Sequence, residues 1–271
     1  MTLLPGVYIA KKKDGTIYYR SSITYKNKHI SLGSYSTEQE ANEAYTCAQT
    51  ILNDSNITID DYTNLHPILD FTKWIVLINF RDNLIYIKTP IYLRKKYFLY
   101  YFSSDFILKF DVDDLFYYSN HKIMKRGNHL FVADYGMQVN IQNRYGIRNF
   151  AVLNRDYYFK NGDSTDYRYG NIVIVNRYYG VQRKNHGITY EAKIHINGDY
   201  LIGVYKSEIE AAIAYNKAVL LLKQKNVAKN FPLNYIDEIN EIEYASILNR
   251  VRISNKIREY QVSDSDTKNI E

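Results

Sequence analysis

The clearest pattern in the chain is an alternating apolar and polar segment followed by an amphipathic one. Over residues 191–196, the side chains of Ala192, Ile194 and Ile196 alternate with polar ones. A period of two predicts a β-strand with one apolar face, and the Asn197-Gly198 dipeptide that follows predicts a tight hairpin. After Ser207, small and apolar residues recur three or four positions apart up to Leu222. This spacing predicts an amphipathic helix that begins after Ser207 as its N-cap.

The same pattern occurs again near the N-terminus. Residues 32–52 align with residues 202–222 at an offset of 170, and nine of the 21 positions are identical. Upstream, Gly6-Val7 matches Gly180-Val181. Thr37 corresponds to Ser207 and is the expected N-cap of the first helix. Each copy therefore predicts three short strands and one helix, and the two copies flank a middle of more than 100 residues.

The middle of the chain has a different pattern. Residues 74–153 contain short apolar runs such as WIVLINF and YFLYYF, separated by turn sequences, and predict a β-rich domain. The run DVDDL, residues 111–115, predicts one helical turn. The acidic stretch 54–70 predicts a linker, and residues 236–260 predict a helical segment whose apolar stripe docks on the sheet or on another subunit. The polar tail from Gln261 is expected to be mobile.

Composition narrows the classes of protein that fit. The chain has 271 residues, 46% of them hydrophobic, with a net charge of +6 and a pI near 9.0. The basic residues gather in 81–176 and 177–235, which favours a polyanionic partner. The single cysteine, Cys47, excludes a disulfide framework and a cysteine-ligated zinc site, and its place beside the helical stripe indicates packing. With no signal-peptide pattern and no membrane-spanning apolar run, we expect an intracellular protein without a membrane partner.

The two repeats resemble the Apetala-two or ethylene-response-factor type of DNA-binding domain. The resemblance rests on Gly-Val near the start, an alternating strand, the Leu/Ile-Gly-x-Tyr sequence and the Glu-Ala-x-x-Ala-Tyr-x-x-Ala helix; the second copy also ends in AKNFP. It implies a sheet whose polar face enters the major groove of DNA. By position, the candidate contacts are Tyr8, Arg20, Ser22, Thr24 and Ser31 in the first copy and Gln182, Lys184, Lys193, His195 and Leu201 in the second. Lys11, Lys12, Lys13, Arg183 and Lys184 stand at predicted hairpin ends, where they suit phosphate contact. Tryptophan is missing from these positions and arginine is scarce, so we expect DNA binding that is weaker or differently specific.

A segment of the middle, residues 157–176, resembles the core of HNH endonucleases of the homing type. Asn161-Gly162, Asp166, Arg168 and Asn171-Ile172 match the family pattern. The resemblance implies a general-base histidine where this chain has Phe159, which has no lone pair to accept a proton. We therefore expect Phe159, Asn161 and Asn171 to mark a degenerate, inactive site that holds neither metal nor cofactor. Asn161-Gly162 is then a turn, and an Asp166–Arg168 interaction is expected to pin the helix start.

These patterns predict an α+β protein in which two small modules, each a three-stranded sheet plus a helix, flank a β-rich, degenerate HNH (ββα-metal-like) domain. The expected divisions are 1–53, a linker at 54–73, 74–176, 177–235, and a helical segment and tail at 236–271. The expected function is binding of double-stranded DNA, with RNA as another possible partner, by an inactive relative of a homing endonuclease. Two alternatives stay open: an active metal-dependent nuclease with relocated ligands such as His121 or His129, and a protein-interaction scaffold. The sequence does not define an oligomeric state.

Overall fold

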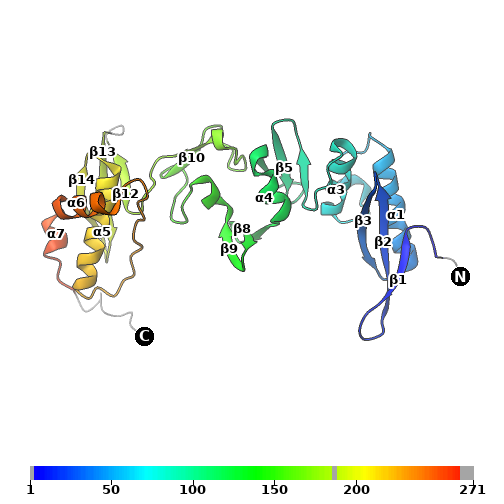
Figure 1. The fold of residues 1–271 in the computed structure, drawn as a ribbon, viewed down its shortest axis with the longest axis horizontal. Coiled ribbons are helices and arrows are strands. Elements are labelled where there is room, and N and C mark those ends of the chain that lie inside the picture. Colours follow the sequence, from blue (N-terminus) through cyan, green and yellow to red (C-terminus); the bar gives the residue numbers. More distant parts are fainter. Residues whose placement is uncertain (1–2, 185–187, 263–271) are drawn as a thin grey trace. The chain divides into compact units, whose positions relative to one another are not determined.

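The computed structural model describes residues 3–184 and 188–262, and Figure 1 shows their helices and strands. These residues belong to two compact units. The first unit comprises residues 1–141 together with 161–171, and the second comprises 142–160 together with 172–271. Small antiparallel sheets and helices make up both units, which confirms the α+β class and the β-rich middle. Each unit contains one copy of the repeat.

The first repeat forms the predicted three strands and helix. β1 (Val7–Lys11), β2 (Ile17–Tyr25) and β3 (Lys28–Tyr35) pair antiparallel in chain order, and α1 (Glu38–Asn53) packs on one face of their sheet. Thr37 caps α1, as predicted: its hydroxyl accepts the Glu40 N–H at 3.2 Å while the Glu40 carboxylate accepts the Thr37 N–H at 3.0 Å. On the face of α1 that meets the sheet, Ala41, Ala44 and Ala48 are fully buried. Because these side chains are small, the helix axis lies close to the sheet.

The second repeat has the same architecture. β12 (Val181–Lys184), β13 (Thr189–His195) and β14 (Asp199–Tyr205) form an antiparallel sheet that α5 (Glu208–Gln224) covers on one face. Ser207 stands at the N-cap position as predicted, but its hydroxyl makes no capping hydrogen bond.

Both repeats contain the same β-bulge. Pairing between β2 and β3 shifts between Ser21 and Ser22, and pairing between β13 and β14 shifts between Ala192 and Lys193. The shift leaves Leu32 in one copy and Ile202 in the other without an opposing residue, and both side chains are buried against the helix. The extra residue changes the local twist of each sheet at an equivalent place.

A steric requirement explains why both repeats have a glycine ahead of their first strand, β1 or β12. Gly6 and Gly180 have φ values of 75° and 72°, in the left-handed region that favours glycine. Their carbonyls accept N–H groups from the bulge of the neighbouring strand, Ser22 at 3.1 Å and Lys193 at 2.8 Å. A Cβ atom at either glycine would overlap the tyrosine ring that the helix places there, Tyr45 or Tyr215. The Gly-Val and Ala-Tyr motifs of the repeat therefore meet in space.

One element of the first unit differs from the sequence prediction. The WIVLINF run, predicted as a strand, is the centre of α3 (Phe71–Asn83), which follows the short helix α2 (Tyr62–Leu65). All side chains of residues 74–80 are buried, so the run has no polar face from which its period could be recognised. Asp70 caps α3 by accepting the Lys73 N–H at 2.8 Å. The stretch interpreted as a linker, 54–73, packs on the first core, where Leu69 is buried and the Thr58 carbonyl accepts the Trp74 Nε1–H at 3.1 Å.

The remainder of the first unit contains two further sheets. One consists of β4 (Ile91–Leu93), β5 (Tyr97–Tyr101) and β6 (Ile107–Asp111), and the other of β7 (Ile123–Arg126), β8 (His129–Asp134) and β9 (Met137–Asn140). The 3₁₀ turn η1 (Val112–Asp114) and α4 (Leu115–Asn120) lie between them in sequence and confirm the predicted helical turn. Buried aromatic rings form the core here, and the Phe110 and Tyr118 rings stack with centroids 4.4 Å apart.

The second unit contains the predicted helical segment near the C-terminus. α6 (Glu241–Arg250) and α7 (Asn255–Arg258) contact α5, and α7 also contacts β14. Ile257 is fully buried, and the Ser254 N–H donates to the Ile202 carbonyl at 2.8 Å. Of the two predicted arrangements, docking on the sheet module or on another subunit, the segment therefore adopts the first. The tail beyond residue 262 lies outside the described residues. The shorter elements are the 3₁₀ turns η2 (Ile141–Tyr145) and η3 (Tyr169–Asn171) and the paired strands β10 (Tyr157–Phe159) and β11 (Ile172–Ile174). In the described part of the chain, no helix has the length and apolar character needed to cross a membrane.

Candidate nucleic-acid interface

Each repeat has a sheet face that points away from its helix. Strand register assigns the side chains to this face, since directly opposed residues of antiparallel strands share one side of the sheet. The first outer face consists of Tyr8, Tyr18, Arg20, Ser22, Thr24, His29, Ser31 and Ser34. The second outer face consists of Gln182, Lys184, Glu191, Lys193, His195, Asp199, Leu201 and Val204. Most of the predicted contact residues therefore do gather on two equivalent surfaces.

The first outer face carries one cation, Arg20, and none of its residues is a carboxylate. Arg20 is exposed; its guanidinium donates to the Tyr18 hydroxyl at 2.8 Å and lies 5.5 Å from the centroid of that ring. Tyr8, opposite Arg20, is 56% exposed, and Thr24 is exposed, whereas Ser22 is buried. Within the described residues, Arg20 forms no ion pair with a carboxylate.

The predicted lysine run stands at the end of the β1–β2 hairpin. Lys11, Lys12 and Lys13 are exposed, and the hairpin closes through the Lys12 N–H, which donates to the Thr16 carbonyl at 2.9 Å. Asp14 is the carboxylate nearest in sequence, and it accepts the Thr16 N–H at 2.9 Å. This hydrogen bond holds the pKa of Asp14 below its ordinary value, so the carboxylate is ionised at neutral pH and offsets part of the local positive charge. The other acids of this module, Glu38, Glu40 and Glu43, lie on α1, which covers the opposite side of the sheet.

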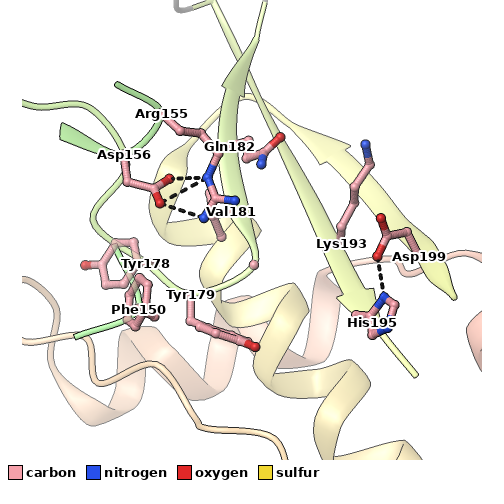
Figure 2. Close-up of a pocket in the computed structure, with 11 residues that line it drawn as sticks. Phe150, Arg155, Asp156, Tyr178, Tyr179, Val181, Gln182, Lys193, His195 and Asp199 are labelled. Atoms are coloured by element: carbon pink, nitrogen blue, oxygen red, sulfur yellow. Dashed lines mark hydrogen bonds and ion pairs between the residues drawn. The ribbon is translucent and has the colours of Figure 1, made fainter. Parts of the chain in front are cut away.

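The second outer face is different because its charges are paired. Glu191 forms ion pairs with both predicted contact lysines, Lys184 at 3.2 Å and Lys193 at 3.1 Å. Burial disfavours the charged form of Glu191, but the two ammonium groups outweigh it and hold the pKa of this carboxyl below its ordinary value. His195 Nδ1 lies 2.7 Å from Asp199 Oδ1, as Figure 2 shows. Arg183 lies on the other side of β12, where its N–H donates to the Asn176 side chain at 2.8 Å.

A cavity of about 220 Å³ borders the second outer face (Figure 2). Its walls come from β12, β13 and a preceding segment that includes Phe150, Arg155 and Asp156. Arg155 and Asp156 form an ion pair at 2.7 Å, and the Phe150 and Tyr179 rings meet edge to face with centroids 5.1 Å apart. Gln182, Lys193 and His195 line the cavity too, so these predicted contact residues face a partly enclosed space.

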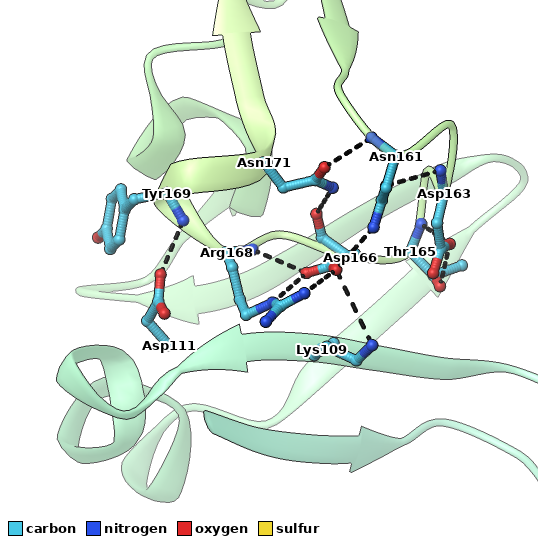
Figure 3. Close-up of polar contacts among 9 residues, drawn as sticks. All are labelled: Lys109, Asp111, Asn161, Asp163, Thr165, Asp166, Arg168, Tyr169 and Asn171. Carbon is cyan, nitrogen blue, oxygen red and sulfur yellow. Dashed lines mark hydrogen bonds and ion pairs between the residues drawn. The ribbon is translucent and has the colours of Figure 1, made fainter. Parts of the chain in front are cut away.

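The loop that resembles the HNH core is a closed polar network around Asp166 (Figure 3). The Asp166 carboxylate is completely buried and accepts from Arg168 Nε at 2.8 Å and Nη2 at 2.7 Å, which confirms the predicted contact. The 3₁₀ turn η3 and the strand β11 follow it in place of the expected helix. Asn161 Nδ2 donates to the same carboxylate at 3.0 Å, and Asn171 accepts the Asn161 N–H at 3.0 Å. Gly162, with φ at 76°, makes the predicted turn. The two asparagines therefore stabilise the loop itself.

This loop is fastened to the edge of the β4–β5–β6 sheet. The Lys109 N–H donates to the Thr165 carbonyl at 3.0 Å, and the Tyr167 N–H donates to the Lys109 carbonyl at 2.8 Å. Asp111 accepts the Tyr169 N–H at 2.8 Å (Figure 3). The loop thus extends the sheet by one short bridge.

The position at which the HNH resemblance implies a general base has no proton acceptor. Phe159 is 7% exposed, and its hydrocarbon ring cannot take a proton from water. His121 stacks on Tyr117 with centroids 4.3 Å apart, and its Nε2 lies 3.6 Å from Asp134. In the part of the chain that the structure describes, no three His, Cys, Asp or Glu side chains are grouped closely enough to hold a metal ion.

Sequence reasoning missed Glu191 and Asp199 as members of the second outer face. The alternation that selects Lys193 and His195 also selects Glu191, so the sequence contained that signal. The contact with Lys184 depends on the β12–β13 register, which the pattern of one strand does not give. Comparison of the chain with protein-family models, curated proteins and solved structures yields no match, so the two family resemblances stay sequence-based predictions.

Proposed function

We propose that the protein binds duplex DNA without cleaving it, and that the first outer face is its main contact surface. The observation that carries this proposal is the arrangement of charge in the first repeat. Among the described residues, neither Arg20 nor the lysine run forms an ion pair with a carboxylate, Asp14 is the one acid in the hairpin, and the acids of the helix lie behind the sheet. A small sheet fits the width of the major groove, where arginine can contact bases or phosphates and lysine can contact phosphates. The net charge of +6 supports the same class of partner.

The experiment is a fluorescence-anisotropy titration of the full chain with random duplex DNA at several salt concentrations. Each phosphate contact contributes about 0.9 to the slope of log affinity against log salt. Arg20→Ala should weaken binding and lower the slope by about 1 if Arg20 contacts phosphate. Replacing Lys11, Lys12 and Lys13 together by alanine should lower it further.

Lys96→Ala is the matched control, because Lys96 is an exposed cation of the same unit in the β4–β5 turn. Binding that is insensitive to salt, or that responds equally to Arg20→Ala and Lys96→Ala, would contradict the proposal. The same titration with single-stranded RNA tests the other possible partner.

The second part of the proposal is that the 161–171 loop has a structural role only. Its support is chemical: Phe159 replaces the base, and the polar groups of Asn161, Asp166 and Asn171 are engaged with one another. We expect no nicking of supercoiled plasmid with Mg²⁺ or Mn²⁺. Metal-dependent nicking that disappears on His121→Ala or His129→Ala would establish the alternative, an active nuclease with relocated ligands.

A further inference from the structure

The two outer faces carry opposite charges at one equivalent position. Ser21 and Ala192 both precede the bulge, so the residues one position before them, Arg20 and Glu191, occupy the same place on β2 and β13. Likewise, Gly33 and Gly203 both follow the bulge, which makes His29 and Asp199 equivalent. The central cation of the first outer face is thus a central anion in the second.

The lysines beside Glu191 explain how this reversal of charge would affect binding of a polyanion. The Glu191 side chain is 14% exposed, whereas its partners Lys184 and Lys193 are 47% and 42% exposed. One carboxylate therefore lies low on the sheet and holds the two ammonium groups that stand above it. A phosphate that approached either lysine would compete with Glu191 and would meet the negative charge of that carboxylate.

We infer that Glu191 prevents the second outer face from binding DNA, so that the two repeats share a backbone but differ in function. This inference rests on the proposed function of the first outer face and deepens it by naming the residue that sets the difference. Glu191 acts as a specificity-determining residue, since its charge decides whether Lys184 and Lys193 are available to a polyanion.

The test is Glu191→Gln in the full chain, measured by the same titration. Glutamine keeps the size of the side chain and removes the charge, which frees two exposed lysines. We expect tighter binding and an increase in the salt slope of between about 1 and about 2, since each new phosphate contact adds about 0.9. Glu241→Gln is the matched control: it changes the net charge equally, but Glu241 is exposed on α6, on the helix side of the same module.

A second pair of variants separates this inference from the proposed function. In the wild-type background, Lys184→Ala with Lys193→Ala should leave affinity nearly unchanged; in the Glu191→Gln background the same pair should return the slope to the wild-type value. Equal slopes for Glu191→Gln and Glu241→Gln, or a wild-type loss on Lys184→Ala with Lys193→Ala as large as that on Arg20→Ala, would overturn the inference.

The wild-type protein itself decides the remaining case. If it shows no salt-sensitive binding but Glu191→Gln does, the inference about Glu191 stands and the proposed role of the first outer face fails. If neither protein binds DNA, both are overturned.

Discussion

The Asp166→Asn substitution keeps the size of the side chain at the centre of the 161–171 loop and removes its charge. In the native protein, this buried carboxylate accepts two hydrogen bonds from the Arg168 guanidinium, one from the Arg168 backbone N–H and one from Asn161. Hydrogen bonds to charged groups contribute about 1.5–3 kcal/mol each, although Arg168 is 38% exposed and water weakens its share. In addition, the new amide N–H₂ would face donor groups of Arg168 or Asn161. We expect the loop to be destabilised by about 3 kcal/mol.

Amide hydrogen exchange measures this loss directly, because the Lys109 and Tyr167 N–H groups join the loop to β6. A loss of about 3 kcal/mol should accelerate their exchange by roughly a hundredfold. Trp74 is the single tryptophan, and it is buried in the first unit, so its fluorescence reports in parallel whether that unit stays folded. Asp163→Asn is a milder comparison, since Asp163 is exposed and bonds only within the turn.

The destabilisation caused by Asp166→Asn should depend on pH. Burial alone would raise the pKa of Asp166, but hydrogen bonds and charge from Arg168, with Lys109, outweigh it and hold the pKa below its ordinary value. A carboxyl with a lowered pKa in the folded state stabilises the fold above its unfolded pKa of about 3.9, and this contribution disappears as the pH falls through the lower folded value. The stability difference between wild type and Asp166→Asn should therefore be full near neutral pH and shrink in acid. Unchanged exchange at Lys109 and Tyr167, or a difference that grows in acid, would refute this account of the loop.

Three further predictions concern packing, helix capping and thiol reactivity. Gly180→Ala should lower stability by more than the roughly 1 kcal/mol cost of a left-handed alanine, because the new Cβ would meet the Tyr215 ring. Gly198→Ala should be tolerated, because the space around Gly198 is open. Chemical denaturation followed by circular dichroism compares the stabilities of the two variants. Thr37→Ala removes half of a capping box and should lower stability by about 1 kcal/mol in the same assay. Unchanged stability would contradict the role of the cap. Burial and the nearby Glu43 raise the pKa of the Cys47 thiol, so alkylation at neutral pH should be slower in the folded protein than in denaturant; equal rates would show that the thiol is not protected.

The repeats were the most predictable part of the fold because their signals are local. Alternation over 191–196 and the alanine stripe each lie within one element, and the N-cap at Thr37 follows from its own sequence. The run at residues 74–80 was mispredicted since an element buried on all sides has no polar positions to show a period. Contacts between elements were harder still. The Asp166–Arg168 pair is two residues apart and was foreseen, whereas the Glu191–Lys184 pair needed a register that only the sheet supplies.

The short bridge between the 161–171 loop and β6 affects how the protein would respond to truncation. β6 forms one edge of its sheet, and the loop occupies the Lys109 N–H and carbonyl on that edge. A fragment that ended at residue 141 would keep the sheet but lose the loop, leaving these two groups free to pair with a strand of another molecule. Self-association of such a fragment, relieved when the loop peptide is added back, would mean that residues 161–171 protect this edge as well as stabilise their own turn.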